Sequence, residues 1–204
     1  MISQRTIGFA AVFTPLWFLA IYLVMSAMRP EYSHSRDAIS ELGSLDAPNL
    51  WAWNIFGYIV PGLVIVVLGT GLKREFSPLG RMATTPFVAL MASGLFMALS
   101  GVFPANMADF ESATTVIHIL GSTGCFIAFL AAGFWFPFSF RKRNAWHWLA
   151  WPSLALVVGS IVSGFLRSGE TSGVGQRLTF ACFFLWVALL GFALLRTNER
   201  PSAV

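Results

Sequence analysis

Six stretches of about 20 predominantly apolar residues follow one another along the chain, each long enough to cross the hydrocarbon core of a bilayer as a helix. They cover approximately residues 6–28, 51–72, 85–103, 115–138, 149–166 and 178–195. Backbone polar groups must be paired inside a bilayer, so runs of this length predict spanning α-helices. The first run is too long for a signal-peptide core, and we read it as an uncleaved helix. We therefore predict an all-α bundle of six transmembrane helices in one integral membrane domain, residues 1–204.

The composition supports the membrane class. Hydrophobic residues make up 56% of the chain and charged residues 11%, whereas soluble domains carry roughly 25% charged residues. The net charge of +4 comes from basic residues that flank the apolar runs. These residues favour membrane lipids as partners, and we expect no nucleic acid.

The orientation follows from the distribution of charge between alternate loops. One side is strongly basic: it holds Arg5, Lys73, Arg74, Arg81, Arg141, Lys142, Arg143, Arg196 and Arg200, with only Glu75 and Glu199 as acids. The other side holds Arg29, Arg36, Arg167 and Arg177 together with Glu31, Asp37, Glu41, Asp46, Asp109, Glu111 and Glu170. Because basic loops are retained in the cytoplasm, we predict a multi-pass protein of the cell inner membrane with both termini in the cytoplasm.

The first outer loop, residues 29–50, is longer than a simple connector requires, and loops of this length often have a function. Ser35 is a candidate N-cap, Ile39 and Leu42 lie on one apolar stripe, and Gly43 is a natural helix stop. We predict a short ordered helix that covers the outer face of the bundle as a lid.

Polar residues in the fourth apolar run share one helix face. Thr115, His118, Ser122 and Cys125 follow one another at steps of three and four residues. Polar side chains inside a membrane normally face the bundle interior or a wet cavity, and a titratable ring there indicates function. The alternative for His118 is a structural hydrogen bond between helices. A polar pocket that opens to the outer side accounts for the pattern.

Two residues are candidates for catalysis in this pocket: Glu41 as a general base and His118 as an acid or orienting group. The candidates for ligand binding are Asn54, Arg167, Arg177, Asp109 and Arg36. Arg167 and Arg177 have an alternative role, in which they extend to the outer headgroups. Asp109 has one as the N-cap of the fourth helix.

Cofactor motifs are absent from the sequence. Cys125 and Cys182 lie in different spans and form no Cys-x-x-Cys motif, and the glycines form no phosphate-binding loop. A zinc site would need His118 with carboxylates such as Asp109 and Glu41, and we predict no metal and no cofactor.

A family resemblance rests on several short motifs. The run Ser-Arg-Asp-Ala-Ile-Ser-Glu-Leu-Gly at residues 35–43, the pair Phe103-Pro104 and the run Gly-Val-Gly-Gln-Arg at residues 173–177 resemble the domain-of-unknown-function 998 family. The chain departs from the family pattern after Phe103-Pro104, where an acid is expected and Ala105 and Asn106 stand. The resemblance implies a prokaryotic multi-pass membrane protein and implies no activity.

Three functions of different classes agree with these features. The first is an intramembrane enzyme that acts at the outer leaflet. The second is a protein that binds a lipid-like or small amphipathic molecule, or one that transports a small solute. Transport is less favoured, because the cytoplasmic halves of the spans contain no acidic or basic residue that could line a path through the membrane. The third is a structural or accessory subunit bound to a membrane-protein partner. The sequence favours binding of, or catalysis on, a lipid-like molecule.

Overall fold

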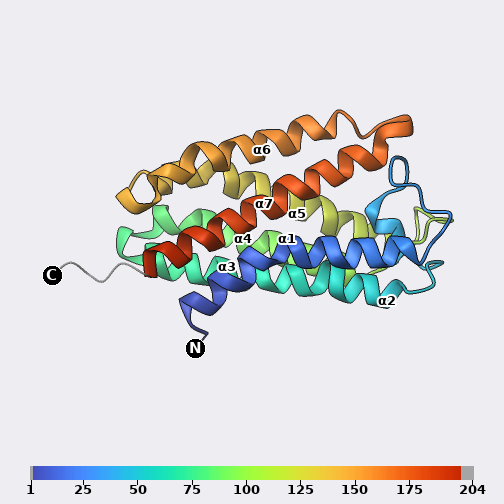
Figure 1. Cartoon of the computed structure of the whole chain (residues 1–204), viewed down its shortest axis with the longest axis horizontal. Helices are drawn as coiled ribbons and strands as arrows, with labels where there is room; N and C mark the ends of the chain where they lie inside the picture. Colours follow the sequence, from blue (N-terminus) through green and yellow to red (C-terminus); the bar gives the residue numbers. More distant parts are fainter. Residues whose placement is uncertain (1, 199–204) are drawn as a thin grey trace.

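Six helical segments run the length of the molecule in a computed structural model that describes residues 2–198 (Figure 1). Each is long and apolar enough to cross a membrane: Gln4–Ala27, Leu50–Leu79, Arg81–Val102, Ala113–Phe140, Asn144–Gly164 and Gly169–Thr197. All elements in the described part of the chain are helical, as predicted. Glu199 and Arg200, which the charge pattern assigns to the cytoplasm, lie outside the described residues.

The first, third and fourth segments are the helices α1 (Gln4–Ala27), α4 (Arg81–Val102) and α5 (Ala113–Phe140). The fifth segment combines the 3-10 helix η4 (Asn144–Leu149) with α6 (Ala150–Gly164). The sixth combines the short 3-10 helix η5 (Gly169–Thr171) with α7 (Ser172–Asn198). The predicted sixth span, residues 178–195, therefore omits the polar first turns of α7, which lie at the end of the bundle.

The second segment changes its helical geometry along its length. It begins with α2 (Leu50–Trp53), continues as the π-helix η2 (Asn54–Ile59), and returns to α-geometry in α3 (Val60–Phe76), before the 3-10 helix η3 (Ser77–Leu79). The departure from α-geometry lies directly before the pair Pro61-Gly62. A proline lacks the N–H for a backbone bond, and π-helical turns within α-helices are frequent at functional sites.

Close packing between helices depends on small residues. α4 packs against α3 and α5, and α7 packs against α1 and α6. A Cβ atom at Gly62 of α3 would lie 2.6 Å from the carbonyl oxygen of Gly94 in α4, so the two backbones touch where only glycine fits. This is the kind of contact that holds helices together in lipid.

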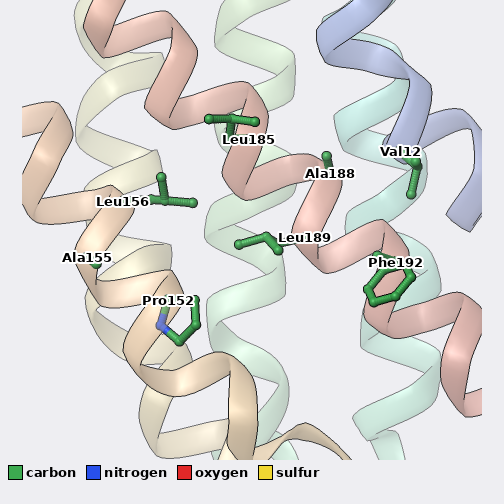
Figure 2. Close-up of a pocket in the computed structure, with 8 residues that line it drawn as sticks. All are labelled: Val12, Pro152, Ala155, Leu156, Leu185, Ala188, Leu189 and Phe192. Carbon is green, nitrogen blue, oxygen red and sulfur yellow. The ribbon is translucent and has the colours of Figure 1, made fainter.

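Apolar side chains cover the outside of the bundle. One example is the shallow groove between α1, α6 and α7 in Figure 2, whose lining residues are all apolar, among them Val12, Leu156, Leu189 and Phe192. In a bilayer such a surface contacts acyl chains and needs no other partner.

The long connection between α1 and α2, residues 28–49, lies at one end of the bundle, which we name the loop end; the start of α1 and the end of α7 lie toward the opposite end (Figure 1). The connection contains the five-residue 3-10 helix η1 (Ile39–Gly43). The N-cap of η1 is Ala38 and not Ser35, because the chain from Ser33 to Asp37 forms a turn of its own. Gly43 ends the helix, as its sequence position suggested.

Candidate functional site

A cavity of about 450 Å³ lies beneath the long connection, between α4, α5 and α7. Its deeper part is formed mainly by apolar side chains: Met97, Phe126, Phe129, Phe180 and Phe183. Toward the loop end Met107 and Phe110 also line the cavity, but most of its polar side chains gather there: Ser100, His118, Ser122, Arg167, Gln176 and Thr179. Ala38 and Ser40 of the connection complete the cavity from above. The cavity is thus amphipathic along its length.

His118 is the titratable residue of the cavity wall on α5. Its ring is 5% exposed, and Nδ1 lies 2.9 Å from the carbonyl oxygen of Ser100 and 3.1 Å from that of Phe103. Because both partners accept, we assign the proton to Nδ1. Nε2 makes no hydrogen bond to any residue between 2 and 198. The sequence left a structural and a functional role open for His118; in the structure Nδ1 makes the structural contact, and the functional role stays a prediction.

Arg167 lies between α6 and η5, at the polar end of the cavity. Its side-chain stem crosses Gly175, where a Cβ atom would lie 2.7 Å from Cγ of Arg167. The guanidinium makes no hydrogen bond or ion pair with the described residues, and no lining residue is acidic. The cavity therefore has an unneutralised positive charge at its end nearer the connection.

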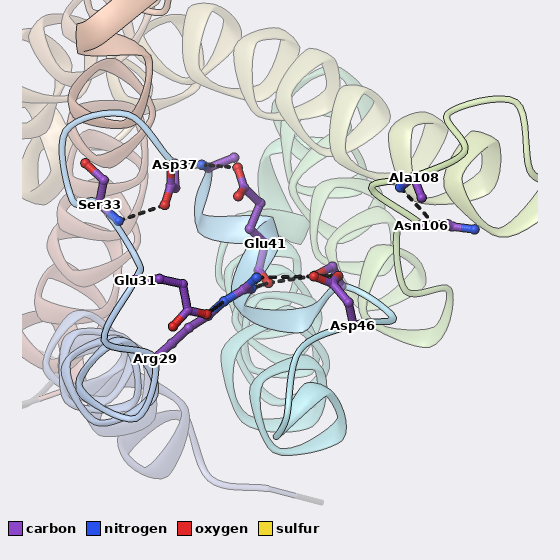
Figure 3. A network of polar contacts seen from close by, with 10 residues as sticks. Arg29, Glu31, Ser33, Asp37, Glu41, Asp46, Asn106 and Ala108 are labelled. Carbon is purple, nitrogen blue, oxygen red and sulfur yellow. Dashed lines mark hydrogen bonds and ion pairs between the residues drawn. The ribbon is translucent and has the colours of Figure 1, made fainter.

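Glu41, the other predicted catalytic residue, is not among the residues that line the cavity. Its carboxylate accepts a hydrogen bond of 2.7 Å from the backbone N–H of Ala38 and caps η1 (Figure 3). Its backbone carbonyl accepts from Nη1 of Arg29 at 2.6 Å. The structure thus gives Glu41 a structural position in the connection.

Arg29 also forms ion pairs with two acids of the connection (Figure 3). Its Nε lies 2.7 Å from Oε1 of Glu31, and its Nη2 lies 3.2 Å from Oδ2 of Asp46. The hydroxyl of Ser44 donates to Asp46 at 2.6 Å, and together with Arg29 it lowers the pKa of the Asp46 carboxyl. Both acids therefore stabilise the folded connection.

Asn54, a predicted binding residue, joins the connection to η2. Its side chain is fully buried, and Nδ2 donates to the carbonyl oxygen of Gly43 at 2.8 Å. A Cβ atom at Gly43 would lie 2.4 Å from Oδ1 of Asn54. The contact fixes the end of η1 against the bundle, and Asn54 does not line the cavity.

Arg177 joins the connection to α7 and α1. Its Nε donates to the hydroxyl of Tyr22 at 2.7 Å, Nη2 to the hydroxyl of Tyr32 at 2.6 Å, and Nη1 to the carbonyl oxygen of Asp37 at 3.0 Å. The guanidinium also lies over both tyrosine rings. Burial raises the pKa of Tyr32, which keeps the hydroxyl proton that it donates to Ala38. Residues of the protein therefore accept hydrogen bonds from all three guanidinium nitrogens of Arg177.

The first turns of α7 provide further contacts to the connection. The side-chain carbonyl of Gln176 accepts from the backbone N–H of Ile39, and the N–H of Val174 donates to the carbonyl oxygen of Ser35. The two runs quoted for the family, residues 35–43 and 173–177, therefore contact each other. Gln176, which also lines the cavity, was not a predicted site residue; its place in the second run was the available signal.

Two predicted binding residues lie outside the cavity wall. Arg36 is exposed, and its Nη1 lies 3.8 Å from Oε2 of Glu170. Asp109 accepts from the backbone N–H of Glu111 within a turn, and α5 begins after Ser112, so Asp109 is not the N-cap. The same stretch contacts the connection through the N–H of Leu45, which donates to the carbonyl oxygen of Ala105 at 2.9 Å.

Potential metal ligands do not converge in the described part of the chain, where no three His, Cys, Asp or Glu side chains are grouped to hold an ion. Cys125 and Cys182 are both free.

The fold and the cavity define a multi-pass membrane protein with an amphipathic site at one end of the helices. The chain belongs to the family described as "Protein of unknown function (DUF998)", whose sequence model matches residues 12–193. The resemblance of the short motifs is thereby confirmed. No curated protein and no solved structure matches the chain.

Proposed function

We propose that this protein binds a lipid-like or small amphipathic molecule in the cavity, with the loop end at the outer face of the cell inner membrane. The observation that carries the proposal is the change along the cavity from an apolar wall in its deeper part to polar side chains at the other end. Aromatic side chains surround its deeper part, and the unpaired guanidinium of Arg167 lies at the end nearer the connection. Pockets for small molecules have volumes of roughly 300–1,000 Å³, mostly apolar walls and a few polar groups.

Access from the membrane is supported by the side of the cavity that α5 forms. Ile119 lines the cavity and is 45% exposed, and Ser122 and Thr123 beside it are exposed as well. These residues belong to a helix long enough to cross the bilayer. An amphiphile can therefore reach the cavity laterally.

The connection acts as a fixed roof in this proposal. Contacts to α1, η2, α7 and the stretch before α5 hold it in place through Arg177, Asn54, Gln176 and Leu45. Opening the cavity from above would break these contacts together, whereas lateral access breaks none of them.

Binding is favoured over catalysis because the chemistry at the cavity is incomplete. A proton-transfer pair of Glu41 and His118 needs both groups at one substrate, but the Glu41 carboxylate is engaged with the backbone N–H of Ala38, and Glu41 does not line the cavity. His118, Arg167 and Gln176 can recognise a ligand without a reaction.

Native mass spectrometry of the full-length protein in a mild detergent tests the proposal. The wild type is compared with Ser122→Trp, which fills the cavity from its α5 side, and with Ile127→Trp on the exposed surface of the same helix. We expect a bound amphiphile of defined mass in the wild type and in Ile127→Trp, and its loss in Ser122→Trp. Equal adducts in all three samples, or none in the wild type, would contradict the proposal. A stoichiometric protein partner without a small molecule would favour the accessory-subunit role.

A further inference from the structure

The geometry points to a specific head group: the cavity selects a single-chain amphiphile whose head carries an anionic group for Arg167 and a hydroxyl that donates to Nε2 of His118. This inference rests on the proposed function and names the class of ligand.

The positive charge of Arg167 in the cavity wall supports an anionic group on the head of the ligand. Arg167 is the one formally charged residue among those that line the cavity in the described part of the chain, and neither a carboxylate nor a hydrogen-bond acceptor of the protein neutralises it. Its stem is held over Gly175, and Arg167 lines the cavity together with Gln176. A guanidinium fork matches the oxygens of a phosphate or carboxylate, and charge-assisted hydrogen bonds are the strongest that a ligand can gain.

Comparison with the other arginines of the loop end makes Arg167 distinct. Arg177 donates to two tyrosines and a carbonyl, Arg29 to two acids and a carbonyl, and Arg36 faces Glu170. Only Arg167 in this group retains its full capacity to bind an anion within the described structure.

The hydroxyl on the head of the ligand is inferred from the tautomer of His118, which leaves Nε2 as a hydrogen-bond acceptor. The carbonyls of Ser100 and Phe103 hold the proton on Nδ1, and the neutral ring then offers the lone pair of Nε2. No lining carboxylate is available to pair with an imidazolium, which supports the neutral form. An acceptor in a largely buried site selects a ligand that brings a donor, because an unpaired buried acceptor costs free energy.

The cavity volume limits the ligand to a single acyl chain. About 450 Å³ lies at the lower end of the range for small-molecule pockets. One chain can lie among Phe126, Phe129, Phe180 and Phe183, while the head occupies the polar wall.

Four probes separate these features, each titrated against the full-length protein in mild detergent by native mass spectrometry. Oleoyl lysophosphatidate has the chain, the anion and a hydroxyl; oleyl phosphate lacks the hydroxyl; monoolein lacks the anion; glycerol 3-phosphate lacks the chain. We expect the wild type to bind lysophosphatidate about fivefold more tightly than oleyl phosphate and roughly tenfold or more tightly than monoolein. Glycerol 3-phosphate is expected to bind least, because it leaves the aromatic part of the cavity empty.

Two substitutions assign the effects. Arg167→Gln is expected to abolish the preference for phosphate over monoolein, whereas Arg36→Gln, which alters an exposed arginine of the same end, is expected to keep it. His118→Asn retains a donor near the Ser100 carbonyl and removes the Nε2 acceptor, so lysophosphatidate and oleyl phosphate should then bind equally. The wild-type probe series tests the inference even where a variant fails to fold.

The outcomes separate this inference from the proposed function. If chain-bearing probes bind the wild type without regard to their heads, or if Arg167→Gln and Arg36→Gln behave alike, the head-group assignment is wrong while amphiphile binding stands. If no chain-bearing probe binds, both fail. Binding of glycerol 3-phosphate as tight as that of lysophosphatidate would overturn both and indicate a site for a free phosphate compound.

Discussion

The side-chain carbonyl of Gln176 accepts a hydrogen bond from the backbone N–H of Ile39, which joins the first turns of α7 to η1, 137 residues apart in the chain. One residue further along α7, Arg177 holds the same connection through Tyr32 and Asp37. The start of the last helix therefore fixes the roof of the cavity.

Replacement of Arg177 by lysine should destabilise the protein. Lysine keeps the charge but cannot reach Tyr22, Tyr32 and the Asp37 carbonyl together, because one ammonium replaces a planar fork. We expect a loss of about 2 kcal/mol in the free energy of unfolding and faster proteolysis within residues 28–49. Thermal unfolding in detergent and limited proteolysis measure the two effects. Arg36→Lys is the control, and equal behaviour of the two variants would show that Arg177 does not hold the connection.

Gly43→Ala should be destabilising because the new Cβ atom would lie 2.4 Å from Oδ1 of Asn54 and from Cδ1 of Trp53. Both neighbours are fully buried, so relief needs movement of the connection, at a cost of about 1–3 kcal/mol. Gly164→Ala is the matched control, since no atom lies within 4 Å of its added Cβ. Unfolding midpoints of the two variants should differ clearly, and a neutral Gly43→Ala would contradict the described contact.

The connection should lose stability in acid through Asp46. The hydroxyl of Ser44 and the charge of Arg29 lower the pKa of Asp46 below the usual value of 3.8. A lowered pKa in the folded state stabilises it above the unfolded pKa, and this stability is lost as the pH falls through the folded pKa. The side chain is 59% exposed, so the effect should stay below about 1 kcal/mol. Unfolding midpoints of the wild type and Asp46→Asn should differ at pH 6, and the difference should shrink as the pH falls below 3.8; a difference independent of pH would exclude this role.

The predicted orientation can be tested by cysteine labelling. In a background with Cys125→Ala and Cys182→Ala, Glu170→Cys lies at the loop end and Lys142→Cys at the opposite end, both exposed. A membrane-impermeant maleimide added to intact cells should label position 170 and not 142, because the basic loops are retained in the cytoplasm. The reverse pattern would invert the topology.

The spanning helices could be predicted from the sequence because hydrophobicity and length define them locally. Their ends could not: α7 begins at Ser172, six residues before the predicted span, because its polar first turns contact the connection and not lipid. The cavity could be predicted in part, since the shared helix face placed His118 in a polar wall. Asn54 and Arg177 looked like binding residues because their hydrogen-bond partners lie in other segments, which the sequence alone does not bring together.

Photo-cross-linking of a diazirine-bearing single-chain phosphate amphiphile, followed by peptide mapping, locates the ligand most directly. We predict adducts on the peptides that contain Phe126, Phe129 and Phe180, and their loss in Ser122→Trp but not in Ile127→Trp. Adducts confined to the outer groove of Figure 2, for example at Leu185 and Phe192, and unchanged by Ser122→Trp, would contradict binding in the cavity.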